Sequence, residues 1–267
     1  MSEQKKVEGL VKQLNVMDDT MFHKVVEDPE VCEELLRVFL QDAELVVISS
    51  TPQKFLRNVE NRSVIVDAYC EGMNEKKYAV EMQKGDYDDH QKRVRYIGSN
   101  VDTRITEKGT DFKDIPDVYV IYLTKFDVFG KKKTVYHIDR TILETGDVVD
   151  NGFHEIYINA EIDDGSETAK LMQYIKHTEG ENEAFKKLSA RVHYLREEGT
   201  HTMCDAVEAY AREYAAEKAI EVEKQSAAEL FKNGASLELV LKSLKILDKE
   251  TIEEIYHEVT GQSKSIS

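Results

Sequence analysis

Cysteine, proline and long apolar segments are scarce in this sequence. Its three cysteines, Cys32, Cys70 and Cys204, are far apart and form no C-x-x-C pair, which argues against a disulfide framework or a zinc knuckle. Three Pro and 13 Gly exclude collagen-like and proline-rich architectures. No apolar run approaches the roughly 18 residues of a membrane-spanning helix, and the N-terminus lacks the apolar core of a signal peptide. We therefore expect a cytoplasmic protein with reduced thiols and no membrane partner.

Positive charge is also in deficit. The 267 residues include 36 Lys and Arg against 52 Asp and Glu, which gives a formal net charge of −16. This balance argues against a protein that coats nucleic acid without specificity, because such proteins are basic. A hydrophobic fraction of 41% is too high for a wholly disordered chain. The sequence therefore predicts a folded protein of one large domain, or one domain with an appendage.

Residue patterns predict a mixed α/β part followed by a helical part. A helix is expected to begin near Asp18 or Asp19, and a second runs from Pro29 to Leu40 behind Asp28 as its N-cap. Strands are predicted over 63–70, 77–83, 118–123, 134–138 and 155–160, with a helix over 88–105. After residue 165 the pattern becomes helical. We therefore divide the chain into an α/β core, 1–165, and a helical C-terminal region, 166–267.

Two acidic residues on a predicted β-hairpin carry the chemistry. Side chains alternate along a strand, so Glu81 and Gln83 share one face of the second strand. A hairpin symmetric about Asn74 places Asp67 opposite Glu81, with Cβ atoms roughly 5 Å apart. Facing carboxylates repel each other, and a hard cation such as Mg²⁺ or Mn²⁺ would relieve that repulsion. Two acids on a solvent-facing sheet surface are the alternative, and the pattern alone does not choose between them.

The pattern D-x13-E-x-Q, with acids on adjacent strands, resembles the PD-(D/E)XK nuclease core in its (D/E)xQ variant. The longer context resembles one branch, the PD-(D/E)XK nuclease family transposases, also called Rpn-type recombination-promoting nucleases. The similar segments are DDTMFHKVV (18–26), VDAYC (66–70), KYAVEMQ (77–83), KRVRYIGS (92–99), KGTDFKDIPDVYVIYLTKFDVFG (108–130), HEIYINAE (154–161) and AREYAAEKAIE (211–221). The resemblance implies a restriction-endonuclease-like α/β fold, with a mixed β-sheet flanked by helices.

The resemblance also implies a site. Asp67 and Glu81 would be metal ligands together with the backbone carbonyl of Met82, and Gln83 would stand where the wider family most often has Lys. A neutral amide can orient water or donate to a phosphate, so the metal would carry more of the charge stabilisation, and we expect a slower or more conditional enzyme. Asp19 matches an acid from the first helix that often joins such sites, and a helix N-cap is its alternative role. Glu34 is a weaker candidate for the same position.

Basic residues follow the hairpin. Lys92, Arg93, Arg95 and Tyr96 lie on the predicted helix after Gln83, where they could contact DNA phosphates, since such contacts need only charge and reach. Solvated basic residues beside a half-buried tyrosine are the alternative. The run 131–133, three lysines after a glycine turn, is interpreted as a solvated turn, with a DNA contact as the alternative.

The sequence thus predicts an Mg²⁺-dependent endodeoxyribonuclease, a hydrolase that acts on DNA during recombination or transposition. A degenerate nuclease fold that serves as a binding or assembly module is the alternative. We expect DNA affinity to be weak without a divalent metal, sensitive to salt and confined to the local basic surface. A homodimer would suit cleavage of paired strands. Met203, Val207, Tyr210 and Tyr214 recur at 4-3-4 spacing in the long helical stretch, which fits a dimer contact or packing on the chain's own domain.

Overall fold

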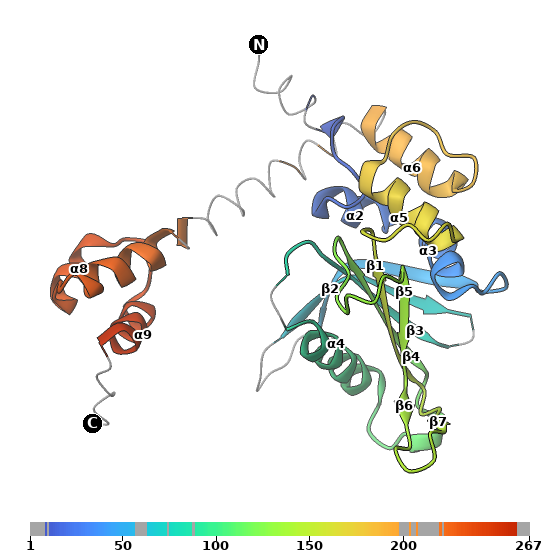
Figure 1. Cartoon of the computed structure of the whole chain (residues 1–267), viewed down its shortest axis with the longest axis horizontal. Helices are drawn as coiled ribbons and strands as arrows, with labels where there is room; N and C mark the ends of the chain where they lie inside the picture. Colours follow the sequence, from blue (N-terminus) through green and yellow to red (C-terminus); the bar gives the residue numbers. More distant parts are fainter. Residues whose placement is uncertain are drawn as a thin grey trace. The chain divides into compact units, whose positions relative to one another are not determined.

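The computed structural model in Figure 1 describes residues 9, 11–56, 63–73, 75–86, 89–197, 203, 207, 219–220 and 222–260. Asn74, Cys204, Tyr210 and Tyr214 lie outside the described residues. The chain divides into two compact units, residues 1–204 and 205–267, and each is treated by itself below. No helix in the described part is both long and apolar enough to cross a membrane.

A mixed six-stranded sheet forms the centre of the first unit. Its strand order is β1-β2-β3-β4-β8-β5, and the strands are β1 (Val47–Leu56), β2 (Val64–Gly72), β3 (Lys77–Gln83), β4 (Val118–Thr124), β8 (Phe153–Asn159) and β5 (Val135–Ile138). The first three strands pair antiparallel, β3, β4 and β8 run parallel, and β5 is antiparallel to β8. Two short strands, β6 (Arg140–Thr141) and β7 (Val148–Val149), form a separate ladder. The predicted α/β fold is confirmed.

The register of the hairpin is the predicted one. Ala68 pairs with Val80 and Tyr69 with Ala79, which is the pairing of a hairpin symmetric about residue 74. Asp67 and Glu81 are the next residues along the two strands, and they lie close enough for the charge of Asp67 to act on Glu81. The strand β1 was not predicted, because its sequence VISSTPQKFL contains a proline and a run of small polar residues, features that weaken a strand signal.

Helices cover both faces of the sheet (Figure 1). On one face lie α2 (Asp19–Val25), α3 (Pro29–Leu40), α5 (Glu167–His177) and α6 (Lys186–Glu197), and on the other lies α4 (His90–Ile105). The Asp28 side chain accepts the Glu30 amide at the start of α3, so the predicted cap is confirmed. A 3₁₀ turn, η1 (Phe112–Asp114), leads into β4.

The hydrophobic core lies on both sides of β4. Val120, Ile121, Tyr122 and Leu123 are fully buried, as expected for a short, continuous apolar strand covered on both faces. Burial of apolar surface stabilises the fold by about 25 cal/mol per Å². The buried side chains of β4 therefore anchor the centre of the sheet. The carboxyl ends of β3 and β4 are thereby held in place beside α4, and this is where the candidate site lies.

The second unit is a small helical body. Its helices include α8 (Leu237–Ser243), α9 (Lys249–Thr260) and a helical segment over residues 222–232. Ala227, Phe231, Val240 and Ile252 form its buried core. The predicted division after residue 165 falls within the first unit, because α5 and α6 pack on α2 and α3.

Candidate active site

Asp67 is held from two directions at the centre of the site. One carboxylate oxygen, Oδ1, lies 3.0 Å from Nε2 of His23 on α2. The other, Oδ2, accepts the backbone N–H of Met82 at 2.8 Å. The Met82 amide thus donates to the Asp67 side chain instead of to a backbone carbonyl of a neighbouring strand. The Asp67 carboxylate is therefore fixed in position, with its negative charge partly balanced.

Glu81, unlike Asp67, has a carboxylate oxygen without a partner. Its Oε2 atom is buried and has no hydrogen-bond partner. Burial, and after it the negative charge of Asp67, raise the pKa of Glu81 to about 8, although the Arg93 guanidinium and the Asp67 backbone amide oppose the shift. The negative charge of Asp19 also raises the pKa of Glu81, by less than the charge of Asp67 does. The neutral acid therefore predominates at pH 7 in the absence of another positive charge.

Asp19 lies near these acids but faces a lysine. It occupies the first turn of α2, and its Oδ1 is 3.0 Å from Nζ of Lys84, which follows β3. The N-cap of α2 is Asp18, so the alternative role of Asp19 as a helix N-cap is wrong. Lys84 also lies 3.6 Å from Asp18. The lysine thus balances two carboxylates at the edge of the site.

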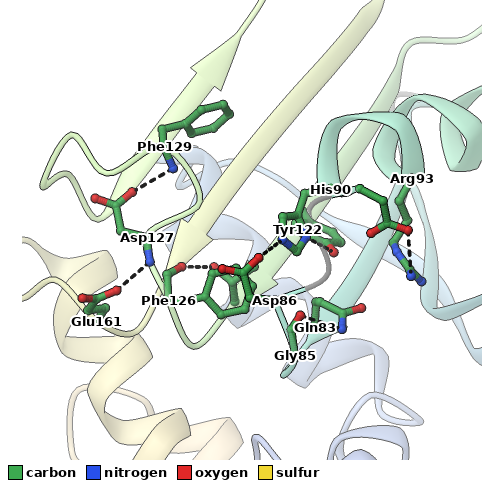
Figure 2. A network of polar contacts seen from close by, with 12 residues as sticks. Gln83, Gly85, Asp86, His90, Arg93, Tyr122, Phe126, Asp127, Phe129 and Glu161 are labelled. Carbon is green, nitrogen blue, oxygen red and sulfur yellow. Dashed lines mark hydrogen bonds and ion pairs between the residues drawn. The ribbon is translucent and has the colours of Figure 1, made fainter.

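Gln83 ends β3 and bonds within its own loop. Its Nε2 donates to the carbonyl of Gly85 at 3.0 Å (Figure 2). The residues beside it form a polar network around the buried His90 that the sequence analysis did not anticipate. His90, only 4% exposed, lies between Asp86 at 2.8 Å and the Tyr122 hydroxyl at 3.0 Å (Figure 2). This network fixes the loop between β3 and α4 on the central strand.

Glu34 is committed elsewhere. Its two carboxylate oxygens accept the backbone amides of Lys187 and Leu188 at 3.1 and 2.8 Å. These amides belong to the first turn of α6, whose N–H groups have no partner within the helix. Glu34 therefore caps α6 from a neighbouring helix. We correct its candidate role in the metal site on this basis.

Removing that cap gives a first prediction. Glu34→Ala is expected to lower the free energy of unfolding by about 1 kcal/mol, because the first-turn amides of α6 lose their acceptor. Thermal denaturation measures this loss. DNA cleavage below the melting temperature should stay at the wild-type level. Loss of cleavage without loss of stability would return Glu34 to the list of candidate ligands.

A groove of about 790 Å³ connects Glu81 to the basic residues of α4. Its lining includes Glu81, the apolar residues Val64, Ile65 and Ile97, and all four candidate DNA-binding residues, Lys92, Arg93, Arg95 and Tyr96. Lys92 and Arg95 are exposed, whereas Arg93 and Tyr96 are partly buried. The sequence placed these groups on neighbouring elements, and the structure brings them to one surface. The lysines 131–133 do not line this groove.

The acids of the site offer oxygen ligands to a metal ion. Carboxylate oxygens are the ligands that Mg²⁺ and Mn²⁺ prefer, and the unpartnered Glu81 Oε2 is such an oxygen. Within the described ranges, no group of three or more His, Cys, Asp or Glu could hold a metal ion. Asp67 and Glu81 therefore fit a hard cation in chemistry, and a backbone oxygen or water would have to supplement them.

Residues 20–229 match the family model of the PD-(D/E)XK nuclease family transposases. The chain belongs to this family. The matched range contains Asp67, Glu81, Gln83 and the basic part of α4, and it begins one residue after Asp19. Comparison with curated proteins and with solved structures gave no significant match.

Membership in the PD-(D/E)XK family has direct consequences. The mixed sheet flanked by helices is the restriction-endonuclease-like fold of these nucleases. A nuclease role follows, with hydrolase chemistry and DNA as the substrate that the family implies. PD-(D/E)XK nucleases usually use divalent metals.

His23 is the site residue that sequence reasoning missed. It is one of eight histidines, and none of them shows a metal-binding spacing. Its contact with Asp67 joins residues 44 positions apart. The only local signal was its place in the DDTMFHKVV segment, four residues after Asp19 and so on neighbouring turns of the same helix.

Proposed function

We propose that this chain is a divalent-metal-dependent DNA endonuclease that hydrolyses phosphodiester bonds during recombination or transposition. One observation carries the proposal: a buried, unpartnered oxygen of Glu81 lies beside Asp67, in the lining of a groove that also bears the basic residues of α4. A buried polar atom without a partner costs about 1–3 kcal/mol. A bound cation or substrate would give this oxygen a partner and remove the cost. The unpartnered oxygen therefore supports a binding site at the groove.

The residues of the site would divide the work. Asp67, Glu81, the Met82 carbonyl and, more distantly, Asp19 would hold Mg²⁺ or Mn²⁺. When bound, such an ion supplies activation of water and stabilisation of charge on phosphate. Gln83 would orient a water molecule or donate a hydrogen bond to a phosphate oxygen, since its amide carries both donors and an acceptor. It brings no positive charge, which supports a slower or more conditional enzyme.

The chain's own contacts would prepare these acids. His23 holds the Asp67 carboxylate toward α2, and the Met82 amide holds it toward β3. A fixed carboxylate loses little conformational entropy on binding a ligand. Glu81 would give up its proton on cation binding, because a nearby positive charge favours the carboxylate form.

The groove would receive the DNA backbone. Lys92 and Arg95 are exposed along its rim and would contact phosphates. A formal net charge of −16 means that the chain as a whole repels DNA. Affinity should therefore be weak without divalent metal and should fall steeply with salt.

A degenerate nuclease fold used as a binding module is the second candidate. It is favoured by the absence, among the described residues, of any group of three acids, cysteines or histidines that could hold a metal. Calorimetric titration with Mn²⁺ separates the two candidates. Heat of binding that disappears in Asp67→Ala supports the nuclease, and no such heat supports the module.

Cleavage of supercoiled plasmid tests the proposal directly. Wild-type protein is expected to convert plasmid to nicked or linear form with Mg²⁺ or Mn²⁺ and to leave it intact in EDTA. The Asp67→Ala and Glu81→Ala variants should leave it intact under both conditions. Equal conversion by wild type and variants, or none by wild type, would refute the catalytic assignment. A direct linear product would support cutting of both strands by a homodimer.

A further inference from the structure

Three residues that line the groove beside α4 each carry a buried polar atom without a hydrogen-bond partner. The atoms are Oε2 of Glu81, Oδ1 of Asp89 and Nε of Arg93. Two of them accept hydrogen bonds, and one, the Arg93 Nε–H, donates. Each buried polar atom without a hydrogen-bond partner costs about 1–3 kcal/mol. The occurrence of three such atoms on residues that line one groove indicates a ligand there, and this ligand would offer a hydrogen-bond acceptor to Arg93.

Arg93 sits differently from the other basic residues of the groove. It is partly buried on α4, while Lys92 and Arg95 are exposed. Its charge reaches Glu81, where it opposes the rise of the carboxyl pKa. A guanidinium at this depth acts through a lower effective dielectric than a rim lysine does, so its attraction for an anion is stronger.

Asp89 directs Arg93 into the groove. The two residues are one helical turn apart, and Oδ2 of Asp89 lies 3.4 Å from Nη2 of Arg93. Asp89 occupies the N-cap position of α4, yet its side chain accepts no capping hydrogen bond from a backbone amide of that helix. The Asp89 carboxylate therefore accepts a hydrogen bond from Arg93 and does not cap the backbone of the helix.

We propose that Arg93 binds the scissile phosphate and supplies the positive charge that Gln83 does not bring to the motif, with Asp89 as its positioning residue. The inference rests on the proposed function and deepens it. A guanidinium presents its N–H groups in a planar fork that matches two phosphate oxygens. Nη2 faces Asp89, and the unpartnered Nε–H remains for the phosphate.

The alternative cation, Lys84, is placed less well. Its Nζ is engaged by Asp19 and Asp18, and it does not line the groove. Arg93 shares the groove lining with Glu81. Lys92 and Arg95 line the groove too, but Arg93 is the cation whose charge acts on Glu81, so a phosphate at Glu81 would meet Arg93.

The test compares Arg93→Gln with Arg95→Gln, which removes the same charge from the same helix at an exposed position. Single-turnover cleavage of a labelled duplex with Mn²⁺ gives the rate, and fluorescence anisotropy in Ca²⁺ gives the affinity. Arg93→Gln is expected to lower the rate by about 100-fold and to weaken binding several-fold. Arg95→Gln should weaken binding and reduce its salt dependence, and its rate at saturating DNA should fall much less than that of Arg93→Gln.

Two further variants separate charge from geometry. Arg93→Lys keeps the charge but not the fork, so binding should be largely retained while the rate falls about 10-fold. Asp89→Asn should lower the rate at saturating DNA with little change in KM or melting temperature. A change confined to melting temperature would mark Asp89 as structural. If Arg93→Gln does not fold, Arg93→Lys and Asp89→Asn decide the matter.

The outcomes distinguish this inference from the proposed function. If wild-type protein cleaves nothing, the nuclease proposal fails, and weaker DNA binding by Arg93→Gln than by Arg95→Gln still supports a phosphate site. If wild type cleaves and Arg93→Gln behaves like Arg95→Gln in both rate and affinity, the role of Arg93 is overturned.

Discussion

Asp67→Asn is expected to abolish DNA cleavage, with a loss of at least about 100-fold in rate, while the protein stays folded. The substitution removes the negative charge and keeps an acceptor for the Met82 amide, which the native Oδ2 holds at 2.8 Å. A neutral His23 can accept a hydrogen bond from the side-chain NH₂ of the new asparagine. Stability should therefore change by less than about 1 kcal/mol.

Asp67→Ala separates the chemical role from the structural one. It removes both the charge and the acceptor, so the Met82 amide and His23 lose their partner. An unsatisfied buried donor costs about 1–3 kcal/mol. Both variants should lose cleavage, and only the alanine variant should unfold at a clearly lower urea concentration. Cleavage by Asp67→Asn at the wild-type rate would contradict the assignment of Asp67 to the site.

Glu81→Gln is expected to make the metal-free protein more stable at pH 8 while it abolishes cleavage. Burial and the Asp67 charge raise the pKa of Glu81 from 4.5 to about 8. Below about pH 4.5 the carboxyl is neutral in both the folded and the unfolded state, and it costs nothing. As pH rises toward 8, the unfolded state ionises and the folded state does not, so the wild type loses stability.

The size of this effect is bounded by the pKa shift. A shift from 4.5 to about 8 corresponds to at most about 5 kcal/mol, and the buried Gln amide keeps part of the desolvation cost. We expect a gain of about 1–3 kcal/mol for Glu81→Gln in EDTA at pH 8, and no gain at pH 4. Urea unfolding across this pH range measures it.

A matched control and a metal arm complete the experiment. Glu71→Gln lies on the same hairpin, where Glu71 pairs with Lys77 at 3.3 Å, and it should give no gain at pH 8. Added Mn²⁺ should stabilise the wild type and leave Glu81→Gln unchanged, since binding to the folded state alone raises stability. A Glu81→Gln variant that is less stable than the wild type at pH 8 in EDTA would contradict the buried, protonated state of Glu81.

Local patterns determined the framework around the site. The start of α3 at Pro29 follows from Asp28 and the missing N–H of proline, both of which act within one helical turn. The register of β2 and β3 follows from the short turn between them and from the alternation of apolar and acidic residues. The buried strand β4 follows from its continuous apolar run. These features depend on residues close together in the chain.

The sequence by itself therefore determined the sheet's central strands, the facing acids Asp67 and Glu81, and the basic helix α4. Only the tertiary structure decided that His23 contacts Asp67, that Glu34 caps α6 and that the Glu81 oxygen lies buried beside Arg93. The His23 and Glu34 contacts join groups 44 and more than 150 residues apart, and no periodicity or spacing in one chain records such distances. Burial likewise depends on which elements pack together, and burial is what sets the protonation state of Glu81.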